Sequence, residues 1–199
     1  MAKGYNKART IQWLTWAFES EDVKKRPCVF LSHKSEDKAA CRIIAEYFKD
    51  AEIDYYLDEN DEILQSAAIA GDSFLVTESI KKGIRASTHM LVVISEKTFT
   101  SPWIPFEIGY GHAAIIDKGL DEGKHADIIK LAVLTLKNIS ETPLPDFMKT
   151  AYIIRGTKSL NEYIAKLTHE KEEKLISEAR MFSNTKSVHP LDTVLNWKL

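Results

Sequence analysis

The sequence predicts an α/β protein: a flavodoxin-like, five-stranded parallel sheet with helices on both faces, and a short extension at each end. Two observations support this fold. Compact apolar runs of the kind buried on both faces of a parallel sheet recur along the chain. Helix-like segments separate them, as the crossover between parallel strands requires. The predicted strand order is 2-1-3-4-5.

The composition limits the classes of partner. The chain has 199 residues, 44% of them hydrophobic, which is enough for one sizeable core. A formal charge of -2 argues against nucleic acid or an anionic membrane as partner. Cys28 and Cys41 lie in no metal-binding or disulfide pattern, so we expect no metal. No stretch resembles a signal peptide or a membrane span, so we expect a cytoplasmic protein.

The first half of the chain contains three predicted strands. An N-terminal extension, residues 1–26, contains an apolar helical pattern over 9–18. The first strand is "PCVFLS", and Ser35 is the expected N-cap of the helix that follows. The second strand is "IDYYLD", and the third is "HMLVVIS".

The segments between these strands are assigned from polar residues and helix signals. The polar stretch 59–71 is expected to be a long loop. Asp72 is expected to cap a helix that runs to about Lys82 and stops at Gly83.

The second half is expected to complete the sheet. A helix to about Lys118 follows the third strand, and "DIIKLAVLTL" and "YIIRG" are the fourth and fifth strands. A charged helix is expected from about Ser159 to Met181. We place the main domain at 27–165 and a C-terminal helix and tail at 166–199. The apolar tail residues are expected to serve packing or assembly: Leu191, Val194, Leu195 and Trp197.

The strand order predicts where a ligand binds. In open sheets of this type, ligands bind outside the carboxyl ends of the strands, where the order reverses, here between the first and third strands. The loops leaving those strands are residues 32–34 and 95–107. Ser32, His33 and Ser95 are therefore candidate binding residues, although a histidine in such a place can equally face solvent.

The stretch "SPWIPFEIGYGH" contains the strongest candidate. Pro105 fits the first helical position, which places Glu107 in the first turn, where free N–H groups and the helix dipole favour a carboxylate at neutral pH. A departing pyridinium, as in NAD, needs no general acid, and one carboxylate suffices to stabilise the ribose oxocarbenium ion. Trp103 would shape the wall of such a site. The alternatives are a helix-start glutamate and a core tryptophan.

Asp58, at the end of the second strand, opens another alternative. This alternative is a phospho-accepting receiver domain, which has the same architecture. That function needs two acidic residues after the first strand for Mg²⁺, and this chain has Ser32 and His33.

Five ordered segments resemble a TIR domain, the module of Toll and interleukin receptors, in its bacterial branch: "VFLSHKSEDK", "IDYYLDEN", "GDSF" with "ESIKKGIRAST", "HMLVVIS" and "SPWIPFEIGYG". The resemblance implies that Glu107, in a W-x-x-x-E segment with Trp103, is catalytic in NAD cleavage. It implies that Ser32 and His33 line the nucleotide pocket, to which we add Asp58, Ser95 and Trp103 as candidate substrate-binding residues. NAD is then a substrate, and no cofactor is expected.

The resemblance also implies partners and a role. Catalytic TIR domains assemble head to tail, and residues 59–71 would meet the neighbouring copy. A stand-alone TIR protein resembles the NAD-consuming component of Thoeris-type antiphage systems, whose cyclic or conjugated ADP-ribose product activates a separate effector protein. The alternatives are a non-enzymatic TIR scaffold, a virulence factor that interferes with host TIR signalling, and an NAD hydrolase that kills by depletion.

Overall fold

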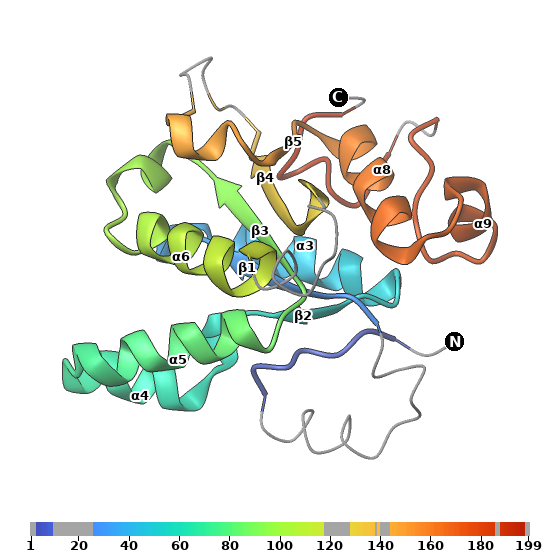
Figure 1. Ribbon diagram of the computed structural model, residues 1–199. Helices are drawn as coiled ribbons and strands as arrows, with labels where there is room; N and C mark the ends of the chain where they lie inside the picture. Colours follow the sequence, from blue (N-terminus) through green and yellow to red (C-terminus); the bar gives the residue numbers. More distant parts are fainter. Residues whose placement is uncertain are drawn as a thin grey trace.

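The computed structural model describes residues 3–9, 26–117, 128–137, 139, 144–185 and 188–197. Within these residues, five parallel strands form one sheet in the order β2-β1-β3-β4-β5, which confirms the predicted fold class and order (Figure 1). The strands are β1 (Cys28–Ser32), β2 (Asp54–Tyr56), β3 (His89–Ile94), β4 (Leu131–Thr135) and β5 (Tyr152–Ile154). Residues 10–18, which hold most of the predicted N-terminal helix, lie outside the described residues.

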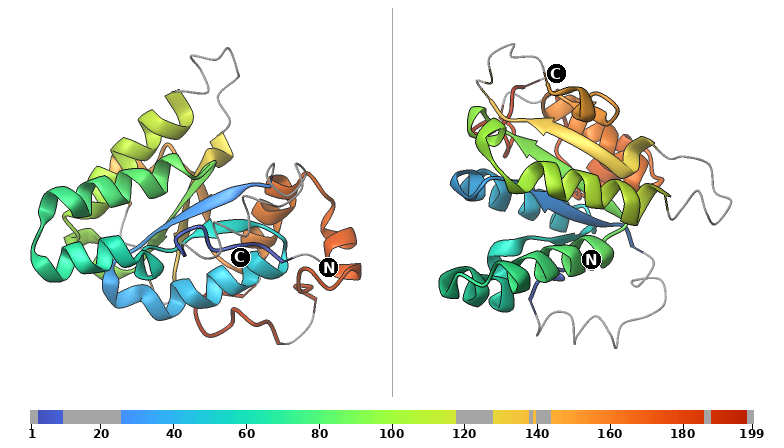
Figure 2. Two further views of the ribbon diagram at one scale, coloured as in Figure 1. Left: turned by 90° about the horizontal axis from the view of Figure 1, so that it is seen from below. Right: turned by 60° about the vertical axis from the view of Figure 1, so that its left-hand side comes forward.

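Helices cover both faces of the sheet (Figure 2). On one face, α3 (Lys38–Asp50) and α8 (Thr157–Thr168) pack against the strands. On the other lie α4 (Glu62–Ala70), α5 (Ser73–Arg85) and α6 (Trp103–Gly111). Because both faces are covered, β1 is buried along its whole length and β3 and β4 along most of theirs, as their unbroken apolar runs indicate.

The helix after β1 begins later than the sequence suggests. Ser35 is not a helix cap, because it opens a 3-10 helix, η1 (Ser35–Asp37), and α3 starts at Lys38. The apolar stripe of α3 follows the helical period, and four of its members are Cys41, Ile44, Ala45 and Phe48. This stripe packs α3 on the sheet.

The predicted loop over residues 59–71 is mostly helical, so that prediction was wrong. A 3-10 helix, η2 (Asp58–Asn60), leads into α4. The Asp61 side chain caps α4 by accepting hydrogen bonds from the amides of Ile63 and Leu64 at 3.0 and 3.1 Å. Gly71 ends the helix in a left-handed conformation, with φ 70°. Asp61 is the last residue of the acidic run "DEND", which is typical of a loop, so the sequence does not single it out as an N-cap.

Helix α5 begins where the sequence predicts but extends beyond its predicted end. Asp72 caps it as predicted, accepting a hydrogen bond from the amide of Leu75 at 3.0 Å. Gly83 does not end the helix, which continues to Arg85. A Cβ at position 83 would lie 2.5 Å from the Tyr56 ring, so the glycine serves close packing of α5 on β2.

The remaining helical turns lie after β3, before β4 and before β5. They are the 3-10 helices η3 (Glu96–Thr100), η5 (Ile128–Lys130) and η6 (Asp146–Met148), and a π-helical segment, η4 (His112–Asp117), which continues α6. The fourth strand is correspondingly shorter than its apolar run, because residues 128–130 form η5.

The C-terminal region is two helices and a tail. The predicted single helix over 159–181 is wrong, because His169 adopts a left-handed conformation after α8 and α9 spans Glu172–Ser177. Leu191 and Leu195 of the tail are fully buried beside α3 and α8. A parallel bridge joins Asn196 to Gly156.

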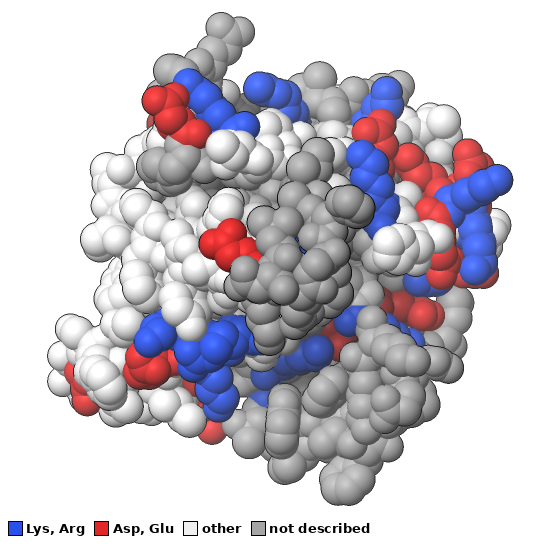
Figure 3. Space-filling model, in the orientation of Figure 1, with Lys and Arg blue, Asp and Glu red and all other residues white. Residues whose placement is uncertain are grey.

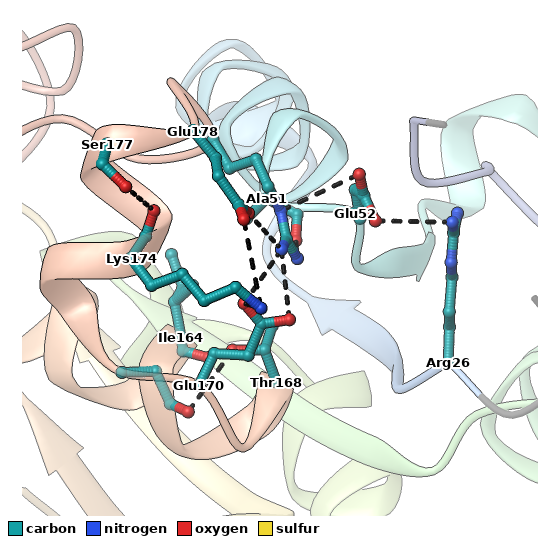
Figure 4. A network of polar contacts seen from close by, with 11 residues as sticks. Arg26, Ala51, Glu52, Ile164, Thr168, Glu170, Lys174, Ser177 and Glu178 are labelled. Atoms are coloured by element: carbon teal, nitrogen blue, oxygen red, sulfur yellow. Dashed lines mark hydrogen bonds and ion pairs between the residues drawn. The ribbon is translucent and has the colours of Figure 1, made fainter. Parts of the chain in front are cut away.

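Arg180 holds this region to the end of α3 through a polar network that includes Glu170, Glu178 and Ala51, which Figure 4 labels. Its guanidinium donates to the Glu170 carboxylate at 3.1 Å, to Glu178 at 3.2 Å and to the Ala51 carbonyl at 3.0 Å. Charge-assisted hydrogen bonds of this kind are stronger than neutral ones. The chain after α9 is thereby fixed to the sheet domain.

Among the described residues, no helix is long and apolar enough to cross a membrane.

Candidate functional site

Four predicted site residues gather at the carboxyl edge of the sheet. Ser32 is the last residue of β1 and His33 follows it. Asp58 opens η2 after β2, and Glu107 reaches the same place from α6. The parallel register brings the ends of β1 and β2 to one edge of the sheet.

Glu107 is an acidic residue on a buried helix face. Helix α6 begins at Trp103, so Pro105 is its third residue and Glu107 lies beyond the first turn. Glu107 shares the inward face with Ile104, Ile108 and Gly111, and only 6% of it is exposed. This apolar face turns its carboxyl toward the sheet.

The environment of Glu107 corrects the prediction that it is ionised at neutral pH. Burial raises the pKa of Glu107 to about 8, and the nearby charge of Asp58 also raises it. The Ser32 hydroxyl donates a hydrogen bond to Glu107 Oε2 at 2.5 Å, which lowers the pKa but does not offset burial. The sequence argument failed because it assumed a solvated first turn.

His33 and Asp58 face each other beside this carboxyl. The His33 side chain is only 1% exposed, so the solvent-facing alternative is excluded. Its Nδ1 lies 3.0 Å from the Leu31 carbonyl oxygen, and its Nε2 lies 3.6 Å from Asp58 Oδ1. Burial raises the pKa of Asp58, and the charges of His33 and Lys38 lower it in part.

Ser95 has a different set of contacts. Its hydroxyl donates to Asp37 Oδ2 at 2.5 Å and accepts from the Lys97 amide at 3.2 Å. Ser95 also forms a capping box with Thr98 at the start of η3. The side chain thus ties the end of β3 to η1. Sequence reasoning missed Asp37; its signal was an acidic residue directly before the α3 stripe.

Trp103 lies on the surface of α6, about one turn before Glu107. Its side chain is 37% exposed and meets Phe106 edge to face, with ring centroids 6.2 Å apart. Phe106 stacks on Tyr110, and Lys81 and Arg85 of α5 lie over the Tyr110 ring. Figure 3 shows this largely uncharged face with basic side chains along its lower border. Trp103 therefore belongs to an aromatic surface of α6.

Metal coordination is not indicated at this edge. In the part of the chain that the structure describes, no group of three or more His, Cys, Asp or Glu residues is arranged to hold a metal ion.

The site thus belongs to an open α/β sheet whose carboxyl edge holds one protonated, buried glutamate and an adjacent histidine–aspartate pair. The family model of the TIR domain matches residues 29–165, and the chain belongs to that family. No curated protein matches the chain significantly.

Proposed function

We propose that this TIR protein is an enzyme that cleaves NAD between nicotinamide and ribose. The observation that carries the proposal is the buried carboxyl of Glu107 at the carboxyl edge of the sheet, held by Ser32. TIR domains include NAD-cleaving enzymes, and ligands of such sheets bind at this edge.

The proposed reaction needs one carboxylate. The C1′–N bond breaks and its electron pair passes to the pyridine nitrogen, which becomes neutral nicotinamide. The ribose is left as an oxocarbenium ion, which ionised Glu107 stabilises. When water is the acceptor, its oxygen bonds to C1′ and one proton is released, giving ADP-ribose.

The raised pKa of Glu107 is compatible with this role. In the free protein at neutral pH, the carboxyl is mainly protonated, because its pKa is about 8. A bound pyridinium places a positive charge near the carboxyl, and an opposite charge at close range favours ionisation. The substrate itself would therefore favour the active form of Glu107.

The other candidate residues would bind the substrate around this centre. We assign Ser32, His33 and Asp58 to the edge that receives the ribose, since Ser32 bonds Glu107, the Asp58 charge acts on Glu107, and His33 pairs with Asp58. Trp103 would offer its exposed ring to an aromatic portion of NAD. Ser95 would contribute indirectly, by holding the loop after β3.

Assembly would complete the active form. Exposed apolar side chains gather on α4 and α5, where Ile69 is 90% and Phe74 72% exposed, and Ile63 and Leu75 are also exposed. Burial of such side chains favours association. We propose head-to-tail self-association through this surface, which includes the segment 59–71.

The biological role that we propose is antiphage defence of the Thoeris type. There the enzyme would release nicotinamide and produce ADP-ribose or a cyclic or conjugated form of it, which a separate effector protein would recognise. The same exposed apolar surface on α4 and α5 also favours the second candidate, a non-enzymatic TIR scaffold. Nicotinamide release that depends on Glu107 would distinguish the enzyme from the scaffold.

The test is incubation of concentrated protein with NAD, with nicotinamide and ADP-ribose products separated by chromatography and identified by mass. We expect Glu107→Gln to keep the fold and to lower nicotinamide release by about two orders of magnitude, because an amide cannot carry the stabilising charge. Glu173→Gln, on the exposed first turn of α9, is the matched control and should retain activity. Equal release by wild type and Glu107→Gln would refute the mechanism.

A further inference from the structure

His33 has one nitrogen whose protonation is fixed by its partner. Nδ1 lies 3.0 Å from the Leu31 carbonyl oxygen, and a carbonyl oxygen only accepts hydrogen bonds. Nδ1 must therefore carry a proton to form this bond. In a neutral ring, that leaves Nε2 without a proton and with a lone pair.

Nε2 of His33 points at the Asp58 carboxyl. The distance from Nε2 to Asp58 Oδ1 is 3.6 Å, an ion-pair distance slightly longer than a direct hydrogen bond. Both atoms are buried, and among the described residues neither has a hydrogen-bond partner. Without a proton between them, a lone pair and a carboxylate oxygen would face each other with no compensation, which is costly in a buried place.

The remaining charges around Asp58 do not replace this proton. Lys38 of α3 faces Asp58 and Glu59 of η2 lies next to it, but the Arg42 guanidinium binds Glu59 at 2.7 Å. The neutral side chains that sense the Asp58 charge are Cys41 of α3 and Tyr56 of β2. Across the edge, Glu107 of α6 senses the same charge.

Glu107 has no cationic counterpart in its electrostatic surroundings as the structure describes them. The Ser32 hydroxyl is its hydrogen-bond donor, and Asp58 is the charged group that acts on it. Asp58 is therefore the ionisable neighbour through which the histidine reaches Glu107.

We propose that His33 and Asp58 form a positioning pair that holds one proton between Nε2 and Oδ1 and so sets the charge that acts on Glu107. The proposal that this pair tunes catalysis rests on the proposed function. The proposal that the pair shares a proton is independent of that function. The two residues act through Glu107 and are not required to touch the reacting atoms.

The first experiment is independent of enzymatic activity. Protein labelled with ¹⁵N in its 6 histidines is followed by NMR at about pH 6, and the His33→Asn spectrum assigns the His33 signals. We expect His33 Nε2 to carry or share a proton in the wild type, and to change to an unprotonated acceptor in Asp58→Asn, whose amide donates to it. An unprotonated Nε2 in the wild type, unchanged in Asp58→Asn, would overturn the pair.

The second experiment measures the pH dependence of nicotinamide release. The pair with its shared proton is neutral overall, whereas His33→Asn leaves the Asp58 charge uncompensated. This charge raises the pKa of Glu107, so the acid limb of the His33→Asn profile should move to higher pH by at least about half a unit. The matched control is His112→Asn, which breaks the exposed pair of His112 and Asp117, 3.3 Å apart, and should leave the limb in place. An unmoved limb in an active His33→Asn protein refutes the tuning role.

These two experiments separate the two ideas. A wild type that releases no nicotinamide while His33 shows the shared proton refutes the proposed function and retains the pair. A wild type that releases nicotinamide but whose His33 Nε2 is unprotonated supports the proposed function and refutes the pair.

Discussion

Replacing Glu107 with Gln should stabilise the protein at neutral pH. The folded protein raises the pKa of this carboxyl from 4.5 to about 8, because it is buried. Between these two values the unfolded chain binds fewer protons than the native protein, so the free energy of unfolding falls as pH rises. The stability that the protonated Glu107 carboxyl contributes is fully present below pH 4.5 and is lost as pH approaches 8.

The size of this effect follows from the pKa difference. At pH 7 the penalty is about 3 kcal/mol, since each pKa unit corresponds to about 1.4 kcal/mol. Gln has a similar shape, accepts the Ser32 hydrogen bond through its amide oxygen and does not ionise. For a chain of this size, Glu107→Gln should therefore raise Tm at pH 7 by about 6–12 °C.

Urea unfolding of wild type and Glu107→Gln at about pH 4.5, 7 and 8 measures this effect. The two midpoints should be close at the lowest pH and should separate as pH rises, while the exposed Glu173→Gln should follow the wild type. Parallel pH dependence of the wild type and Glu107→Gln would refute the assignment of a buried, protonated Glu107.

Two further predictions concern stability. Gly83→Ala should lower the free energy of unfolding by about 1–3 kcal/mol, because the new methyl group meets a Tyr56 ring that Asp61 and Phe30 hold in place. Gly109→Ala should raise the free energy of unfolding by about 0.5–1 kcal/mol, because no atom lies within 4 Å of the new methyl group. Chemical unfolding that gave both changes the same sign would contradict the packing argument. Burial lowers the pKa of His189, so the stability that the neutral ring contributes is present above pH about 6.5 and is lost as pH falls through the lower pKa of the folded protein. Between pH 7 and 5, the urea midpoint of the wild type should therefore fall more steeply than that of His189→Asn. Equal slopes would exclude His189 as the cause of the pH dependence.

The sheet was predictable because β1, β3 and β4 are unbroken apolar runs that need two covered faces. The five strands and their order follow from that pattern and from crossover connections. Helix limits were less predictable, because they depend on tertiary contacts. Gly83 continues α5 because it fits against Tyr56, and Asp61 caps α4 from within a run of acidic residues that resembles a loop.

The site was predictable in position but not in electrostatics. The order of the strands places Ser32, His33 and Asp58 at one edge, and the helix after β3 brings Glu107 to them. Burial of Glu107 depends on the rotation of α6, which the two prolines of the segment do not determine. The contact of Ser95 with Asp37 joins residues 58 positions apart, and no local pattern encodes it.

The buried C-terminal tail has a consequence for the order in which the protein folds. Tyr47 of α3 donates a hydrogen bond to Asn161 at 2.8 Å, contacts His189 Nε2 at 3.2 Å and accepts from the Phe182 amide at 3.0 Å. A nascent chain that has exposed only residues up to 165 lacks two of these partners, and the apolar face under α3 and α8 lacks the cover of Leu191 and Leu195. The domain therefore reaches its final form only after residues 188–197 have been synthesised, and until then that face needs protection from aggregation.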